Sequence, residues 1–262
     1  MKILICTSNA TRHRFVANLL GEAAEEALII SECRKHDTAE NENLETANPL
    51  IAKSLNERFE TEERFFVGNE SFRFPVIPIL WKEINLPKLY EIVKKFSPDM
   101  IFVYGSSIIK EPFVSILEPG KTINMHLGLS PYYRGSGTNF WPFVNRELEY
   151  VGATLLHLDP GIDTGDIIAH VRPKIEKDDN VHTLGCKTIR DGAFGLVRLL
   201  KIVKEGRILP RHKQWKTSIA HYYETKDLTE EIMKKYYHNM ETGMITEHLE
   251  KQQANIRFIP LP

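Results

Sequence analysis

The chain has 262 residues, with 34 Lys and Arg against 35 Asp and Glu, so its formal net charge is −1 when histidine is neutral. This length allows one large domain, or a domain of about 200 residues with a small appendage, and the balanced charge excludes the global basic field that drives nonspecific nucleic-acid binding. No apolar run approaches the ~20 residues of a membrane span, and the N-terminal run is too short for a signal peptide, so we expect a cytoplasmic protein without a membrane partner.

Strands and helices are predicted to alternate along most of the chain. In chain order, the pattern predicts a strand at residues 2–6, a helix around 15–20, a strand at 27–31, a charged helical region at 37–63, a helix at 87–96, strands at 100–104 and 122–126, a short helix at 139–145, strands at 150–158 and 167–171, and a long helix at 181–205. The strands are short apolar runs, and the clearest helices carry apolar residues at helical spacing. This alternation indicates an α/β fold, a Rossmann-like, mostly parallel sheet with helices on both faces.

The pattern changes after Gly206, which supplies a stop for the long helix. Beyond it, aromatic residues are scattered among many charges. This segment is too short for a typical second domain. We therefore predict a catalytic domain at residues 1–206 and a small C-terminal accessory segment at residues 207–262.

Polar side chains follow two of the predicted strands. Strand 100–104 ends in Gly105-Ser106-Ser107, and the next strand carries Asn124 and His126 two residues apart. At that spacing both side chains leave the same face of a strand. A later loop, rich in Gly and Asp, contains Asp163. This layout predicts an active site at the carboxyl edge of an α/β sheet.

The three polar residues suit a reaction in which negative charge develops on a carbonyl oxygen. Asn124 offers an amide donor, His126 offers a second donor or a general acid, and Asp163 can orient the histidine or take a proton. The segment 128–131, Gly-Leu-Ser-Pro, is not the G-x-S-x-G motif of a serine nucleophile, because it lacks the second glycine. We therefore expect direct attack by the acceptor. Each residue alone also fits an ordinary structural role.

A metal-dependent deacylase is the rival chemical interpretation. Six side chains that could bind zinc lie close together in sequence: His126, His157, Asp159, Asp163, Asp166 and His170. None has the H-E-x-x-H or a similar helical spacing, so we predict no metal. A catalytically idle folate- or nucleotide-binding module is a third alternative.

The stretch Arg134-Gly135-Ser136-Gly137-Thr138 has the glycines of a phosphate-binding loop but lacks the Gly-Lys-Ser/Thr ending of a P-loop. A nucleotide-binding P-loop is therefore not predicted. We expect the loop instead to present Tyr132, Tyr133 and Arg134 to a planar or anionic ligand.

The sequence resembles the 10-formyltetrahydrofolate-dependent formyltransferase family. The resemblance is carried, in chain order, by Asn124-Met125-His126, Leu129-Ser130-Pro131, Arg134-Gly135, Gly152-Ala153-Thr154 and Gly161-Ile162-Asp163-Thr164-Gly165. It spans residues 1–205 and implies a Rossmann-like fold with Asn124, His126 and Asp163 as the catalytic set. In that family a formyl group passes directly from the folate to a primary amine. The resemblance implies that Asn124 and His126 stabilise the oxyanion, while Asp163 positions His126 and helps to move a proton.

The same resemblance implies a binding site for the co-substrate, 10-formyltetrahydrofolate. The folate ring would lie between the turn at 105–109 and the loop at 159–163, mostly in contact with backbone groups. The implied folate-binding residues are Ser106, Ser107, Ile108, Ile109, Asp159, Gly161 and Ile162.

Three features bear on the acceptor. Glycinamide ribonucleotide transformylase has a glycine-rich turn after its first strand, whereas residues 8–12 contain no glycine. Methionyl-tRNA formyltransferase usually adds a C-terminal domain of about 100 residues that helps to hold tRNA, and the segment after residue 206 is about half that size. Residues 130–142 are most similar to the sugar N-formyltransferases, which act on amino groups of nucleotide-linked deoxysugars and include a pseudaminic-acid-pathway type.

We therefore expect a nucleotide-sugar acceptor and no nucleic-acid partner, with a methionyl-tRNA formyltransferase-like enzyme as the alternative. A homodimer is one assembly that the sequence allows. The candidate acceptor-binding residues are Arg12, Arg14, Tyr133, Arg134 and Trp141.

Overall fold

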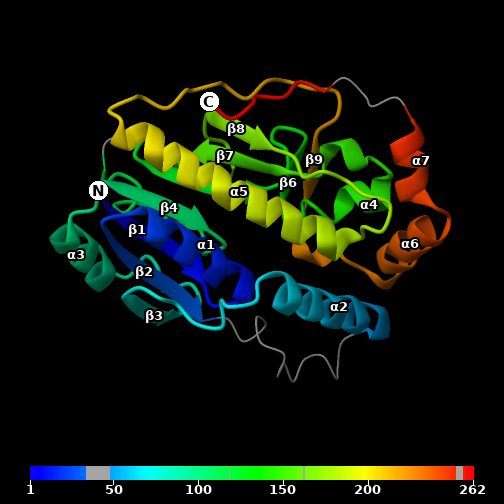
Figure 1. The fold of residues 1–262 in the computed structure, drawn as a ribbon, viewed down its shortest axis with the longest axis horizontal. Helices are drawn as coiled ribbons and strands as arrows, with labels where there is room; N and C mark the ends of the chain where they lie inside the picture. The colour runs from blue at the N-terminus through cyan, green and yellow to red at the C-terminus, as the bar shows by residue number, and fades with distance from the viewer. Residues whose placement is uncertain (34–47, 118, 162, 252–255) are drawn as a thin grey trace.

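A seven-stranded sheet forms the centre of the computed structural model, which describes residues 1–33, 48–117, 119–161, 163–251 and 256–262 (Figure 1). The strands lie in the order β3-β2-β1-β4-β5-β7-β8. Their bounds are β1 (Lys2–Ser8), β2 (Glu26–Cys33), β3 (Val76–Leu80), β4 (Met100–Tyr104), β5 (Thr122–Leu127), β7 (Ala153–His157) and β8 (Ile167–Val171). Neighbouring strands from β3 to β5 pair in parallel. The β5–β7 and β7–β8 pairs are antiparallel. The predicted mostly parallel α/β sheet is confirmed.

Helices cover both faces of this sheet. The helices are α1 (Thr11–Ala23), α2 (Pro49–Phe65), α3 (Pro87–Phe96), α4 (Trp141–Asn145), α5 (Val181–Lys204), α6 (Glu230–Glu241) and α7 (Met244–Glu250). Alternate residues of β1 point to opposite faces, as strand geometry requires. Ile3 and Ile5 pack under α1 and α5, whereas Leu4 and Cys6 pack under α3. Figure 1 shows α1 and α5 side by side across one face of the sheet.

Several predicted elements differ from the observed ones at their ends. Helix 87–96 is observed with the predicted bounds, and the long helix ends at Lys204. Strand β7 begins at Ala153, not at 150, because Leu148–Tyr150 forms a turn of 3₁₀ helix. In the charged region predicted as helical over 37–63, α2 begins at Pro49, and 37–47 lie outside the described residues.

Strand β3 was not predicted from the sequence. Its segment, Val76–Leu80, contains Pro78 in the middle, and a proline usually excludes a central strand. Because β3 lies at the edge of the sheet, one of its sides needs no hydrogen-bonding partner. An edge position therefore accommodates the missing N–H.

The C-terminal segment packs against the rest of the chain through a second apolar cluster. This cluster contains Tyr133, Trp141 and Phe143 from the loop after β5 and helix α4, together with Met233 and Tyr236 from α6. A small parallel sheet joins the two parts: β6 (Tyr133–Gly135) pairs with β9 (His221–Tyr223). The C-terminal segment is thus continuous with the body of the protein in its packing.

The last described residues run beside β8. The N–H of His170 donates to the carbonyl of Ile259 at 2.6 Å, and the N–H of Ile259 donates to Nδ1 of His170 at 3.0 Å. None of the helices formed by the described residues is long and apolar enough to cross a bilayer.

Candidate active site

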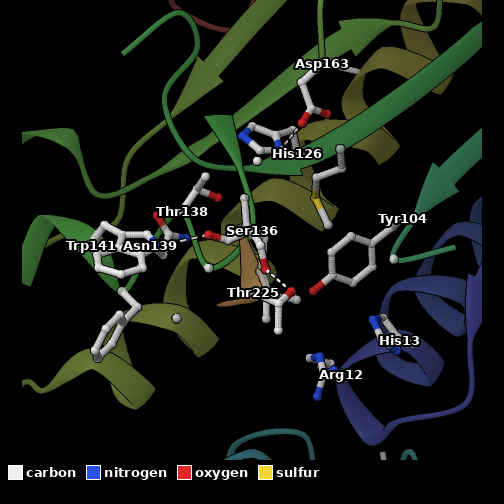
Figure 2. A pocket seen from close by; sticks show the side chains of 18 of the residues that line it. Arg12, His13, Tyr104, His126, Ser136, Thr138, Asn139, Trp141, Asp163 and Thr225 are labelled. Atoms are coloured by element: carbon white, nitrogen blue, oxygen red, sulfur yellow. Dashed lines mark hydrogen bonds and ion pairs between the residues drawn. The ribbon is translucent and has the colours of Figure 1, made fainter. Parts of the chain in front are cut away.

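A cavity of about 670 Å³ opens at the carboxyl ends of β1, β4 and β5. This volume lies within the usual range for small-molecule sites. Its walls come from the turns after these strands, from α2, from the first turns of α5, and from the C-terminal segment at Glu224, Thr225, Leu228 and Met233. Figure 2 shows the His126–Asp163 pair at one side of the cavity and Arg12 at the opposite side.

Strand β5 delivers Asn124 and His126 to the cavity together. Ile123, before the pair, and Met125, between its members, pack in the core under α5. Asn124 and His126 therefore project from the opposite face of the strand, toward the cavity. Asp163 faces both. The amide Nδ2 of Asn124 donates to Oδ1 of Asp163 at 3.3 Å, and Nδ1 of His126 lies 3.3 Å from Oδ2. One carboxylate therefore holds both side chains.

The second nitrogen of His126 is also fixed. Its Nε2 lies 3.1 Å from the carbonyl oxygen of Tyr133. Because a carbonyl oxygen can only accept, Nε2 carries the hydrogen of this bond. Nδ1 then either shares a proton with Asp163 or faces it as a second acceptor. The carboxylate of Asp163 and the carbonyl of Tyr133 therefore fix the orientation of the His126 ring at the cavity wall.

Six of the seven residues predicted to bind folate line this cavity: Ser106, Ser107, Ile108, Ile109, Asp159 and Gly161. The seventh, Ile162, lies outside the described residues. Asp159 also closes its own loop, because its carboxylate accepts from the N–H of Gly161 at 3.1 Å and from the hydroxyl of Thr164 at 2.8 Å. The two segments predicted to enclose a flat ring therefore face the same cavity.

The predicted acceptor-binding residues divide into two groups. Arg12 and Trp141 line the cavity, whereas Arg14, Tyr133 and Arg134 do not. Tyr133 is fully buried, and its hydroxyl donates to Oε2 of Glu147 at 2.5 Å. The expectation that Tyr132 and Tyr133 meet a planar ligand is wrong, because both rings pack in the apolar cluster with α6.

Trp141 lines the cavity as part of a supported stack. Its ring lies 3.9 Å from that of Tyr223 at an interplanar angle of 9°. Its indole N–H donates to the carbonyl of Ser136 at 3.0 Å. One face of the indole is therefore covered by the C-terminal segment.

Arg12 of α1 and two charged residues of α2 form a cluster at the cavity wall, and the two α2 residues were not among the predicted site residues. Nη1 of Arg12 lies 3.0 and 2.9 Å from the two carboxylate oxygens of Glu62, and Nε of Arg58 lies 3.6 Å from Oε1. All three residues line the cavity. Arg58 and Glu62 are four residues apart on one helix, and this spacing was the available signal. The carboxylate of Glu62 thus contacts two guanidinium groups at one wall of the cavity.

The six candidate zinc ligands do not gather at one point. His157 and His170 are bonded through Nε2 to the carbonyls of Pro210 and Ser130, at 3.0 and 2.8 Å. Burial lowers the pKa of His157, and it lowers that of His170 to about 4. Among the described residues, no group of three or more His, Cys, Asp or Glu is placed to hold a metal ion.

The sequence is similar to those of known formyltransferases. The methionyl-tRNA formyltransferase of Caldanaerobacter subterraneus subsp. tengcongensis is 36% identical over 132 residues, 50% of this chain and 42% of that protein. The chain therefore matches less than half the length of this relative.

Solved structures of the same kind share the fold. The phosphoribosylglycinamide formyltransferase from Anaplasma phagocytophilum has a TM-score of 0.56 at 16% identity, covering 86% of this chain and 98% of that one. The formyltransferase PseJ from Anoxybacillus kamchatkensis, in complex with UDP-4,6-dideoxy-4-formamido-L-AltNAc and tetrahydrofolate, has a TM-score of 0.51 at 19% identity, covering 90% and 97%. A family model described as formyl transferase matches residues 7–200. The chain belongs to the formyl transferase family.

Proposed function

We propose that this protein transfers a formyl group from 10-formyltetrahydrofolate to a primary amine on a nucleotide-linked amino-deoxysugar. The observation that carries the proposal is the single carboxylate of Asp163, which holds both Asn124 and His126 at the edge of a cavity. An amide donor, an imidazole and a proton acceptor are the groups that transfer from an amide-like donor to an amine requires.

In the proposed reaction the acceptor amine attacks the formyl carbon directly. A new C–N bond forms, and the carbonyl oxygen becomes an oxyanion. Asn124 stabilises it with the amide hydrogen that does not bond Asp163, and His126 contributes when a ring N–H turns to the oxyanion from its present partner. The nitrogen of the amine loses a proton to the His126–Asp163 pair. As the intermediate collapses, the bond to N10 of the folate breaks and that nitrogen takes up the proton from the same pair, so tetrahydrofolate and the N-formylated sugar leave.

The folate is proposed to bind between the Ser106–Ile109 turn and the Asp159–Gly161 loop. Both segments line the cavity on the side of β4 and β7, next to Asn124. A turn that exposes backbone N–H and C=O groups suits a heterocycle with several donors and acceptors on its edge.

The nucleotide of the acceptor is proposed to lie toward α2. Arg12 and Arg58 both line the cavity and both contact the carboxylate of Glu62. Guanidinium groups at this wall suit a diphosphate, because each can bind phosphate oxygens bidentately. The cavity is also walled by Thr225, Leu228 and Met233 of the C-terminal segment. An enclosed wall of this kind favours a small acceptor.

Methionyl-tRNA is the second candidate acceptor. It is favoured by the curated relative, which is named a methionyl-tRNA formyltransferase and is 36% identical over its matched stretch. The structural neighbours support the sugar, since the PseJ structure contains a UDP-linked formamido sugar with tetrahydrofolate. The two candidates differ in the space they need beyond the reactive amine.

Transfer assays with purified protein test both the formyl transfer and the choice of acceptor. We expect turnover with 10-formyltetrahydrofolate and a nucleotide-linked 3-amino or 4-amino sugar, and none with methionyl-tRNA or glycinamide ribonucleotide. Turnover with methionyl-tRNA alone would replace the proposed acceptor and keep the formyl transfer. No turnover with any of these amines would contradict the formyl transfer itself.

Substitution of the candidate catalytic residues provides the first prediction. Asn124→Ala and His126→Ala should each lower kcat by about 100-fold or more, the usual effect of removing an oxyanion donor, with an unchanged melting temperature. Asp163→Asn should lower kcat while tetrahydrofolate binding, measured by calorimetry, stays close to that of the wild type. Near wild-type turnover in Asn124→Ala and His126→Ala would remove the proposed mechanism.

A further inference from the structure

Glu32 is a fully buried carboxylate that the proposed mechanism does not use. It is the penultimate residue of β2 and is 0% exposed. Removing a carboxylate from water costs several kcal/mol unless donors compensate it. A buried carboxylate at the carboxyl edge of the sheet therefore needs compensating hydrogen bonds, and Glu32 accepts several.

Three donors from two different loops converge on Glu32. The N–H of Ser107 donates to Oε2 at 2.6 Å, and the hydroxyl of Ser107 donates to Oε1 at 2.7 Å. The N–H of Lys82, in the turn after β3, donates to Oε1 at 2.9 Å. Hydrogen bonds to an ionised carboxylate are about twice as strong as neutral ones. Glu32 thus ties the turn after β4 to the turn after β3.

The turn after β3 adopts an unfavourable backbone conformation to make this contact. Lys82 has a φ of 72°, in the left-handed region that residues other than glycine seldom occupy. Such a conformation is strained and persists only when the surroundings enforce it. The hydrogen bond from the backbone N–H of Lys82 to the carboxylate of Glu32 offsets that strain.

The turn after β4 is also held at its other side. Nδ2 of Asn85 donates to the carbonyl of Ile108 at 2.8 Å, and Oδ1 of Asn85 accepts from the N–H of Lys110 at 2.8 Å. Ser106, Ser107 and Ile108 line the cavity. The proposed folate turn is therefore a preorganised surface, clamped by side chains that come from outside it.

The bond from Ser107 has a further electrostatic consequence. The N–H of Ser107 and the carbonyl of Ser106 belong to the same peptide group. When that N–H donates to a carboxylate, electron density shifts toward the carbonyl oxygen, and the oxygen becomes a stronger acceptor. In a trans peptide this carbonyl points away from the N–H that faces Glu32. Ser106 itself lines the cavity, next to the proposed folate site.

We propose that Glu32 is a positioning residue for the formyl donor: its buried carboxylate fixes the Ser106–Ile109 turn and strengthens the Ser106 carbonyl as an acceptor for the N–H groups of the pteridine ring. This inference rests on the proposed function, because it assigns the turn to the folate. Glu32 acts through Ser107 and does not touch the ligand.

The test is the isosteric substitution Glu32→Gln, which removes the charge and turns one oxygen into a donor that faces other donors. Calorimetric titration with 5-formyltetrahydrofolate should give a dissociation constant raised by about 10-fold, the effect of losing one charge-assisted contact. In steady-state assays the KM for 10-formyltetrahydrofolate should rise similarly, while the KM for the amine stays within about 2-fold.

A matched control comes from Glu62, a buried carboxylate that lines the cavity on the side of Arg12. Glu62 is 4% exposed and binds Arg12 on the opposite wall, so Glu62→Gln is the same chemical change in the proposed acceptor half. It should raise the KM for the amine and leave the affinity for 5-formyltetrahydrofolate unchanged. A general loss of structure would weaken both ligands in both variants.

Ser107→Ala keeps the test decisive if Glu32→Gln fails to fold. This substitution removes only the hydroxyl contact at a partly exposed position, and a roughly 3-fold weaker affinity for 5-formyltetrahydrofolate is expected. Wild-type affinity in a folded Glu32→Gln protein, or in Ser107→Ala when Glu32→Gln is unfolded, would overturn the inference alone. A wild-type protein that does not bind 5-formyltetrahydrofolate would instead remove the proposed function.

Discussion

His170 shows how one buried imidazole joins three segments of the chain. It is 1% exposed, its Nε2 donates to the carbonyl of Ser130, and its Nδ1 accepts from the N–H of Ile259. Both bonds require the neutral ring, because a protonated Nδ1 cannot accept. Burial lowers the pKa of His170 from its ordinary value of 6.5 to about 4.

The lowered pKa of His170 predicts a loss of stability in acid. The unfolded chain binds a proton at this residue below a pH of about 6.5, whereas the folded protein does so only near pH 4. The free energy of unfolding therefore decreases as the pH is lowered from about 6.5 to about 4. Lowering the pKa from 6.5 to about 4 contributes roughly 3 kcal/mol to the free energy of unfolding at neutral pH. Urea unfolding at pH 7 and pH 5 should show a smaller pH dependence in His170→Asn than in the wild type. An equal decrease in the free energy of unfolding between pH 7 and pH 5 in both proteins would contradict a role for His170 in the acid sensitivity.

At the same scale, the spacing of Asn124 and His126 was enough to predict that they share one face, because strand geometry is local. Asp163 was a candidate partner of His126 because of its Gly- and Asp-rich loop, and the resemblance implied the same role. Its contact with both Asn124 and His126 could not follow from spacing, since it lies in a distant loop. The aromatic character of Tyr133 was read as ligand binding. Its packing partners come from the C-terminal segment, and no local pattern indicated that they would cover it.

The small sheet formed by β6 and β9 connects the C-terminal segment to His126. Tyr133 begins β6 and pairs with His221, and its carbonyl oxygen is the partner of Nε2 of His126. Next to it, Gly135 has a φ of 92°, and a Cβ at this position would lie 2.1 Å from the carbonyl oxygen of Tyr223. Only glycine allows the two strands to approach this closely.

Gly135→Ala should therefore force β6 and β9 apart and displace the carbonyl that orients His126. We expect kcat to fall by about 10-fold or more, since small displacements of a catalytic group are costly, and the free energy of unfolding to fall by roughly 1–3 kcal/mol. The control is Gly243→Ala, where φ is also positive, at 79°, and nothing lies within 4 Å of the added Cβ. An equal loss of kcat in both variants would argue against the role of β6.

Most elements of the sheet and its covering helices were predictable, because apolar runs and helical periodicity are local signals. The exceptions are elements whose stability comes from their partners. Strand β3 contains a proline, and β6 and β9 are each three residues long and exist through mutual pairing across the chain. A single sequence carries no direct signal for such pairings.

At the scale of the whole molecule, the C-terminal segment both supports and encloses the catalytic part. The backbone of Arg257 exchanges hydrogen bonds with the hydroxyl of Tyr132, and Ile259 pairs with His170 of β8. Leu261 packs against the core that lies under α5. The division at residue 206 stays a prediction about sequence organisation, and we infer that both parts work as one unit.

Deletion of residues 256–262 tests that inference. It removes the partners of His170 and Tyr132 together with apolar contacts, so we expect a loss of about 2–4 kcal/mol, or roughly 5–15 °C in melting temperature. Removal of Leu261 and Pro262 alone keeps the hydrogen bonds and should have a smaller effect. Calorimetric melting of both truncated proteins provides the measurement. Unchanged melting in the longer deletion would show that the segment is dispensable for stability.

The wall that Glu224, Thr225, Leu228 and Met233 contribute to the cavity lies beyond the stretch that matches the family, residues 7–200. The residues proposed for bond making lie within that stretch. Part of the acceptor wall is therefore built from residues outside the family match, whereas Arg12, Arg58 and the candidate catalytic residues lie inside it. Substitutions in the terminal segment can thus reshape the cavity without changing any residue proposed for bond making.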